Sequence, residues 1–139
     1  MPVTNRCFFD TNVIVYAHDD GAPRKRDCAR TLLVSSLLDG TGVISAQVLG
    51  ETYITLTKKL GIDEQAAAQE ILQLAEFRTV EISASLVLRA LQIKQEFTLS
   101  YWDSLIVSAA EFARCSTLWS EDLNDGQTYG TVTVRNPFK

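Results

Sequence analysis

The chain has 139 residues, of which 46% are hydrophobic and 22% are charged, and its formal net charge is −4. This length fits a single domain over residues 1–139, and the negative charge excludes an overall positive field as the means of holding a nucleic acid. No run of about 18 uncharged apolar residues occurs, and the first residues do not join a basic region to an apolar one. We therefore expect no membrane span, no secretory signal and a cytoplasmic location.

Short strands are predicted to alternate with helices along the chain. Apolar residues lead up to Asp10, and Pro23 suits the first turn of a helix. Later helices have plausible N-caps at Ser45, Asp63 and Ser83. In chain order, the expected elements are a strand over 3–9, a helix over 12–18, a helix from 23 to about 38, a strand over 43–44, a helix from 46 to near 60, a helix that follows Asp63, a strand over 78–83, a helix that follows Ser83, a helix that opens within 99–104, a short strand in 116–122 that runs into an acidic turn, and a strand over 130–137. This order predicts an α/β fold, with a central, mostly parallel sheet of about five short strands flanked by helices.

Four acidic residues are expected near the carboxyl ends of these strands, where open α/β sheets bind their ligands. Asp10 follows the first strand directly, and Glu51 lies on the helix after the second strand. Asp103 is in the first turn of a strongly apolar helix, and Asp122 follows the fourth strand. Each acid alone has an ordinary interpretation as a helix cap, a solvated helix face, a partner of the helix dipole or a turn residue. Together at one rim of the sheet, they predict a shared site.

Carboxylates that converge repel one another, and they stay ionised only where a cation neutralises them. Oxygen ligands without His or Cys suit a hard ion, so the expected cofactor is Mg²⁺ or Mn²⁺. Such an ion can lower the pKa of a bound water and stabilise charge on a departing oxygen. The acidic set therefore indicates hydrolysis of a phosphodiester, with the metal supplying the local positive charge that attracts the phosphate.

The cysteine and histidine content argues against other kinds of site. Cys7, Cys28 and Cys115 are odd in number and have no C-x-x-C spacing, which speaks against a disulfide framework and a zinc cluster. The single histidine, His18, excludes a His-pair metal site and makes a Ser–His–acid triad a poor candidate. We expect the cysteines in the core and His18 at a helix end.

Four segments of the chain, FFDTNVIVYA, ISAQVLGETY, YWDSLIVSAA and LWSEDLNDG, together resemble the PIN-domain family, in particular the VapC-type ribonuclease toxins of bacterial type II toxin–antitoxin pairs. The resemblance runs from Phe8 to Phe138 and has the four motifs in the family's order. It implies a parallel sheet flanked by helices and a Mg²⁺- or Mn²⁺-dependent endoribonuclease. The implied partners are an RNA substrate, an antitoxin protein and a second copy of the chain in a homodimer.

The resemblance also implies roles for the four acids, because each matches one of the family's acidic positions. Asp10 and Asp103 would bind the metal directly. Glu51 and Asp122 would bind a second ion or a metal-bound water and would orient or deprotonate the nucleophile. All four, Asp10, Glu51, Asp103 and Asp122, are therefore the expected catalytic and metal-binding residues.

Three further positions match the family pattern around these acids. Thr11 matches a small hydroxyl residue that would fix Asp10 by a hydrogen bond, and Asn12 matches the polar residue after it. Some family members carry another acid after the fourth one, and here that place falls on Asn124 or Asp125. Whether Asp125 reaches the metal is left open by the sequence.

Two smaller features have a functional and an ordinary interpretation. The segment PRKRDCAR, residues 23–30, is the densest basic cluster, and it could guide an RNA backbone, meet an acidic partner or simply be a solvated helix face. Tyr101 and Trp102 precede the third acid, and we expect them to pack in the core, with stacking on an unpaired base as the alternative.

Two other classes of protein are weighed against the nuclease. A metal- or RNA-binding module without catalysis would carry the same acidic set. A haloacid-dehalogenase-type phosphatase also begins with an apolar strand that ends in Asp, but it needs a second acid two residues later, where this chain has Asn12. The nuclease is therefore the preferred prediction.

Overall fold

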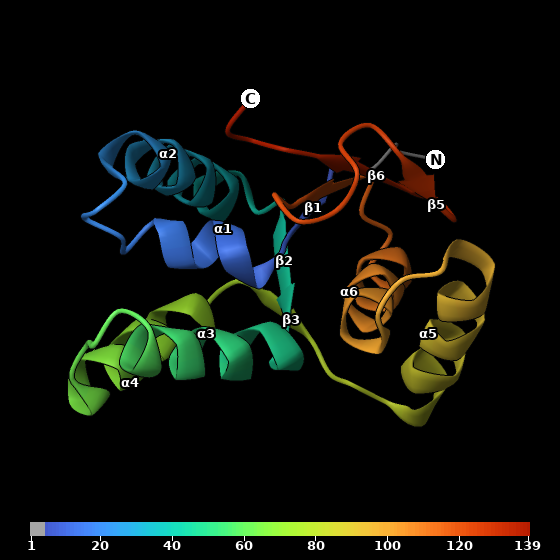
Figure 1. Cartoon of the computed structure of the whole chain (residues 1–139), viewed down its shortest axis with the longest axis horizontal. Coiled ribbons are helices and arrows are strands. Elements are labelled where there is room, and N and C mark those ends of the chain that lie inside the picture. Colours follow the sequence, from blue (N-terminus) through green and yellow to red (C-terminus); the bar gives the residue numbers. More distant parts are fainter. Residues whose placement is uncertain (1–4) are drawn as a thin grey trace.

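The computed structural model describes residues 5–139, and within this range it has six strands and six helices, with a pair of helices after each of the first three strands (Figure 1). The order is β1 (Cys7–Phe9), α1 (Thr11–Tyr16), α2 (Pro23–Asp39), β2 (Gly42–Ser45), α3 (Ala46–Lys58), α4 (Glu64–Leu74), β3 (Arg78–Val80), α5 (Ala84–Phe97), α6 (Tyr101–Phe112), β4 (Thr117–Trp119), β5 (Thr128–Tyr129) and β6 (Val132–Arg135). The first predicted strand was expected to begin at residue 3, and residues 3 and 4 lie outside the described range.

The strands form one sheet in the order β3-β2-β1-β4-β6-β5. All neighbouring strands are parallel except β5 and β6, which form an antiparallel pair. The predicted α/β fold with a mostly parallel sheet is therefore confirmed. The sequence did not predict β5, because a strand of two residues is too short to show alternation.

The helix boundaries follow from local chemistry that the sequence displays. Ser45, Asp63 and Ser83 each accept a hydrogen bond from a backbone N–H near the start of the next helix, which confirms the three predicted caps. Helix α2 begins at Pro23, as predicted. It ends at Gly40, whose φ of 72° is the left-handed conformation that favours glycine.

Helices cover both faces of the sheet, with α1 to α4 on one side and α5 and α6 on the other (Figure 1). Residues 104–110 of α6 are all buried, which makes this helix the centre of its layer. Arg89 of α5 binds Glu111 of α6 through two hydrogen bonds of 2.8 and 3.1 Å. Phe112, the last residue of α6, is 67% exposed.

The strand order places a site between β1 and β4. From β1 the chain proceeds to β2 and β3 on one side of the sheet and later to β4 on the other, so the strand order reverses at β1. Ligands of open α/β sheets bind beyond the carboxyl ends of the strands at such a point. Phe9 pairs with Trp119, so the next residues, Asp10 and Ser120, lie side by side at this edge. In the described part of the chain, no helix is long and apolar enough to cross a membrane.

Candidate active site

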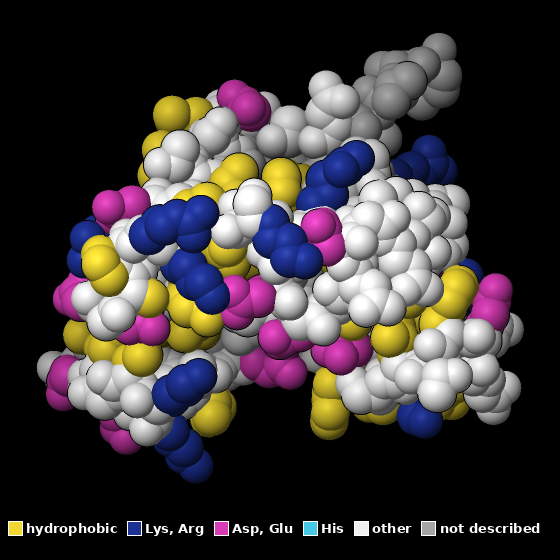
Figure 2. All heavy atoms as spheres, turned by 45° about the horizontal axis from the view of Figure 1, so that its top comes forward, with side chains coloured by type: hydrophobic (Ala, Val, Ile, Leu, Met, Phe, Trp, Pro, Cys, Tyr) yellow, Lys and Arg dark blue, Asp and Glu magenta, His cyan; other side chains and the backbone are white. Residues whose placement is uncertain are grey.

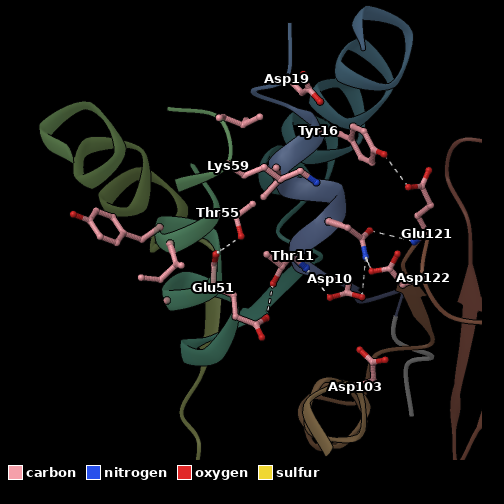
Figure 3. Close-up of a pocket in the computed structure, with 16 residues that line it drawn as sticks. Asp10, Thr11, Tyr16, Asp19, Glu51, Thr55, Lys59, Asp103, Glu121 and Asp122 are labelled. Carbon is pink, nitrogen blue, oxygen red and sulfur yellow. Dashed lines mark hydrogen bonds between the residues drawn. The ribbon is translucent and has the colours of Figure 1, made fainter. Parts of the chain in front are cut away.

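A pocket of about 830 Å³ opens at the carboxyl edge of the sheet, between α1 and α3. Six acidic residues and one lysine line it, together with polar and apolar side chains: Asp10, Asp19, Glu51, Asp103, Glu121, Asp122 and Lys59. Figure 2 shows Asp and Glu side chains gathered in the middle of the face that it draws. In Figure 3, the four predicted acids lie around one space, from the start of α1, from α3, from α6 and from the segment after β4. The structure therefore brings together all four side chains that the sequence singled out.

Asp10 is the most enclosed of these acids, with only 6% of its surface exposed. Its Oδ1 accepts a hydrogen bond from the backbone N–H of Thr11 (2.7 Å), so Asp10 caps α1. Its Oδ2 accepts hydrogen bonds from the Ser120 hydroxyl (2.8 Å) and the Asn12 amide (3.1 Å). Burial raises the pKa of Asp10 to about 6, and the charges of Asp103 and Asp122 add to this rise against the opposing hydrogen bonds.

Thr11 contacts two of the acids. Its backbone N–H donates a hydrogen bond of 2.7 Å to Asp10, so the predicted hydrogen bond to Asp10 is present. Its hydroxyl makes a contact that was not predicted, a hydrogen bond of 2.8 Å to Oε1 of Glu51. This contact follows from the packing of the two helices, because Thr11 is the first residue of α1 and α3 packs beside α1.

Glu51 is also held from its other side by Gln47, one turn earlier on α3. The Gln47 amide Nε2 donates to Oε2 of Glu51 (3.3 Å) and to the backbone carbonyl of Trp102 on α6 (3.1 Å). Gln47 thereby ties the helix that carries Glu51 to the helix that carries Asp103. Its own Oε1 is buried and has no hydrogen-bond partner in residues 5–139. No role was predicted for Gln47, because its contact with α6 arises only in the folded chain.

Asp103 and Asp122 complete the acidic set at the open side of the pocket. Asp103 is half-buried in the first turn of α6. Burial raises its pKa, the charges of Asp122 and Glu51 raise it further, and the hydrogen bond from Ser100 opposes them. Asp122 is exposed, and its Oδ2 accepts a hydrogen bond of 3.0 Å from the Asn12 amide.

Asn12, which the sequence singled out only as a polar residue, is a bridge in the site. Its Nδ2 contacts both Asp10 and Asp122, and its Oδ1 accepts the backbone N–H of Glu121 (3.1 Å). The first helix is thereby joined to the segment after β4. This arrangement fixes the spacing of two acids that are far apart in the sequence.

Ser120 and Glu121 are site residues that the sequence did not reveal. Ser120 is fully buried, donates to Asp10 and accepts the backbone N–H of Asp122 (3.2 Å). The available signal was its place directly after a strand that neighbours β1. Glu121 lines the pocket, but it accepts a hydrogen bond from the Tyr16 hydroxyl (2.9 Å) and forms an ion pair with Lys25.

Asp125 and the basic segment 23–30 both make contacts outside the acidic set. Asp125 does not line the pocket; its Oδ1 accepts the backbone N–H of Asn136 (2.9 Å). The basic segment 23–30 is largely engaged with the protein itself. Arg24 donates to the carbonyl oxygen of Phe138, and Lys25 forms an ion pair with Glu121. Arg26 forms ion pairs with Asp20 and Asp27, and Arg30 donates to the carbonyl oxygen of Ala17.

The aromatic pair before Asp103 also differs from the prediction. Trp102 was expected in the core, yet 60% of its surface is exposed. It lies edge-on to Tyr101, with ring centroids 5.0 Å apart and an interplanar angle of 72°. Trp102 is in the first turn of α6, before the buried residues 104–110.

The donor chemistry of the pocket suits a divalent cation, although the carboxyl groups do not form a preassembled cluster. In residues 5–139, no group of three or more His, Cys, Asp or Glu side chains is placed so as to hold a metal ion. The charges of neighbouring acids nevertheless raise the pKa of Asp10 and of Asp103, and in the described part of the chain the lining contains one lysine against six carboxyl groups. Oxygen donors with excess negative charge are the set that Mg²⁺ or Mn²⁺ prefers.

The comparisons with known proteins agree on the family and the fold. A family model of the PIN domain matches residues 7–124. VapC20 from Mycobacterium tuberculosis, described as a sarcin–ricin loop cleaving toxin, is similar in fold with 21% sequence identity and a TM-score of 0.68, over 84% of this chain and 89% of that chain. A toxin–antitoxin complex from Klebsiella pneumoniae has 22% identity and a TM-score of 0.70, over 94% of this chain and 97% of that chain. VapBC2 from Rickettsia felis, bound to a DNA fragment from its promoter, has 20% identity and a TM-score of 0.69, with the same coverage of 94% and 97%. No curated protein matches the chain at a significant level.

Proposed function

This chain belongs to the PIN-domain family, and from that premise we propose that it is a metal-dependent endoribonuclease, the toxin of a toxin–antitoxin pair. The observation that carries the proposal is the meeting of four carboxyl groups in one pocket, where burial and mutual repulsion raise the pKa values of Asp10 and Asp103. Such a group of acids needs a cation in order to be fully ionised. A cation held there would attract the negatively charged phosphate of an RNA strand.

The proposed roles follow from how each acid is held. Asp10 and Asp103 would bind Mg²⁺ or Mn²⁺, since Asp10 is fixed by three donors and Asp103 faces it from α6. The ion, when bound, would lower the pKa of a water and stabilise charge on the departing oxygen. Glu51 and Asp122 would orient that water and take its proton.

The reaction would be an in-line hydrolysis at phosphorus. The oxygen of the attacking water would bond to phosphorus, and the bond from phosphorus to the 3′ oxygen would break. The departing 3′ oxygen would take a proton, so the products would be a 3′-hydroxyl and a 5′-phosphate. Glu51 suits the proton-accepting role because Thr11 and Gln47 each hold one of its carboxylate oxygens and so orient it.

The proposed partners are RNA, an antitoxin protein and a second copy of the chain, in the cytoplasm. Two of the structurally similar proteins are toxin–antitoxin assemblies, which supports a protein partner. The surface of α2 supports it too, because Val34 and Leu38 lie one turn apart on this helix and are 57% and 81% exposed. Neighbouring exposed apolar side chains of this kind are typical of protein interaction sites.

The test is cleavage of a structured RNA by the purified protein with Mg²⁺ or Mn²⁺ and with EDTA. We expect cleavage only with the metal, products with 5′-phosphate ends, and no cleavage by Asp103→Asn. Asp125→Asn is the matched control, because it changes a carboxylate outside the pocket, and it should cleave at the normal rate. Circular dichroism would establish that both variants are folded.

The same assay separates the two other classes of protein. RNA binding with no cleavage under any metal would show the non-catalytic module. Release of phosphate from a small monoester would indicate a phosphatase, although Asn12 is an amide, already bonded to Asp10 and Asp122, and cannot serve as the general acid.

A further inference from the structure

The pocket continues along α3 beyond the carboxyl groups. Glu51, Thr55 and Lys59 all line it, and their spacing of four residues places them on one face of the helix. Lys59, the C-cap residue of α3, follows Glu51 by eight residues, which is about 12 Å along the axis at 1.5 Å per residue. The pocket is therefore longer than a metal centre requires. Its acidic end holds Asp10, Glu51, Asp103 and Asp122, and in Figure 3 Lys59 lies between this end and Asp19.

Lys59 carries a positive charge that is not paired with a carboxylate of the described residues. Among the described residues it is the only Lys or Arg that lines the pocket, and its side chain is exposed. In residues 5–139, its ammonium group has no ion pair within 4.0 Å, although six carboxyl groups line the same pocket. Lys25, which lies nearby, is different because it is bound to Glu121 and lies over the rings of Tyr16 and Phe138.

The charges along the pocket also fit a strand of nucleic acid better than a single phosphate. A metal at the acidic end would neutralise the phosphate that is cut, but the remaining carboxyl groups would repel the phosphates on either side of it. A cation farther along the same wall would offset that repulsion. The apolar side chains of Val15 on α1 and Ile54 on α3 line the pocket beside this path and offer a surface to a sugar or a base.

We propose that Lys59 is a substrate-binding residue whose ammonium group binds a backbone phosphate of single-stranded RNA flanking the phosphate that is cut. This inference rests on the proposed function and names how the substrate is held. The strand would lie along α3, with the cut phosphate near Glu51 and a neighbouring phosphate at Lys59. Lys59 would therefore contribute to RNA affinity and not to the chemical step.

Lys58 is a matched control for this role. Both lysines lie at the carboxyl end of α3, so both interact favourably with the helix dipole. Both are exposed, but only Lys59 lines the pocket. A loss that comes from the helix end or from net charge would be the same in Lys58→Ala and Lys59→Ala, whereas loss of a phosphate contact would occur in Lys59→Ala alone.

The experiment measures binding of a single-stranded RNA in the Asp103→Asn background, which keeps the RNA intact, over a series of KCl concentrations at fixed low Mg²⁺. For a single strand, one phosphate contact contributes about 0.7 to the steepness with which log affinity falls against log salt. At 0.1 M salt, losing that contact lowers the affinity roughly fivefold. We expect Lys59→Ala to have a slope that is shallower by that amount and an affinity that is lower by that factor. Lys59→Arg should keep the slope and the affinity of the Asp103→Asn parent, and Lys58→Ala should match this parent.

Equal slopes for Lys59→Ala and Lys58→Ala would overturn the inference, whether both fall or neither does. The proposed function is tested separately by cleavage with the unsubstituted protein. A protein that cleaves RNA while Lys59→Ala keeps the parent slope would refute only the role of Lys59. A protein that never cleaves RNA would refute the proposed function, and the role of Lys59 with it.

Discussion

Replacing Asp10 with Asn should stabilise the metal-free protein at neutral pH while it removes activity. Asp10 is buried, and its pKa rises from an ordinary 3.8 to about 6, so its charged form is unfavourable in the folded state. Between about pH 4 and pH 6, the folded state binds more protons than the unfolded state. The free energy of unfolding therefore falls as the pH rises through this range, and it stays lower above it.

The magnitude follows from the same values. The difference between about 6 and 3.8, at about 1.36 kcal/mol per pH unit, corresponds to a penalty of about 3 kcal/mol at pH 7.5. Asn removes the charge, but its N–H₂ group is itself a donor. It would face other donors, because Thr11 N–H, Ser120 and Asn12 all donate to Asp10. One mismatched hydrogen bond costs about 1 kcal/mol. We expect a net stabilisation of about 2 kcal/mol.

The assay is urea unfolding with EDTA at pH 7.5 and at pH 3.5, with Asp63→Asn as the control. Asp63 also caps a helix, but it is exposed, and Asn caps about as well as Asp, so its substitution should change little at either pH. Asp10→Asn should be stabilising at pH 7.5 and slightly destabilising at pH 3.5, where Asp10 is protonated. Added Mg²⁺ should stabilise the parent more than the variant.

A destabilisation of the same size at both pH values would refute this reasoning, because it would mean that the Asp10 carboxylate is not strained by its surroundings. A variant that keeps full cleavage would separately refute the assignment of Asp10 to the metal site.

Two further predictions concern the residues that hold the acids. Ser120→Ala removes a donor that favours the charged form of Asp10, so the acid limb of the pH–rate profile should move to higher pH. Activity at neutral pH should fall roughly tenfold to a hundredfold. An acid limb that does not move would contradict this prediction. Thr11→Val removes the hydroxyl that orients Glu51 and should lower kcat roughly tenfold or more with little change in KM. Thr57→Val is the control and should leave the rate unchanged, because the Thr57 hydroxyl contacts only backbone carbonyls of α3. Equal losses in the two variants would count against an orienting role for Thr11.

Much of the fold could be predicted because its signals are local. Pro23 and the capping residues Ser45, Asp63 and Ser83 each act on backbone groups within a few residues, so their effects are readable from the sequence alone. The four acids could be expected at one rim for a similar reason. Each lies at or near the end of a strand or at the start of a helix, and parallel strands place those ends at one edge.

The contacts that hold the acids could not be predicted in the same way, since they depend on which elements become neighbours. The Thr11 hydroxyl bonds Glu51 because α1 packs on α3, and Gln47 reaches a carbonyl of α6. Ser120 lies beside Asp10 only because β4 pairs with β1. No local pattern carries these pairings, so the positioning residues became visible only with the structure.

The central strand β1 completes its pairing with β4 near the other end of the chain, and Asp10 and Asn12 meet Ser120 and Asp122 across 110 residues. During translation, the pocket therefore cannot close until the segment after β4 has left the ribosome and has packed against α1. On the proposed function, a nascent chain that has not yet folded this segment would be harmless to the messenger RNA that encodes it. Cleaving power would arrive only when Ser120 and Asp122 have packed against α1, at the moment when a separate inhibitor can also recognise the pocket.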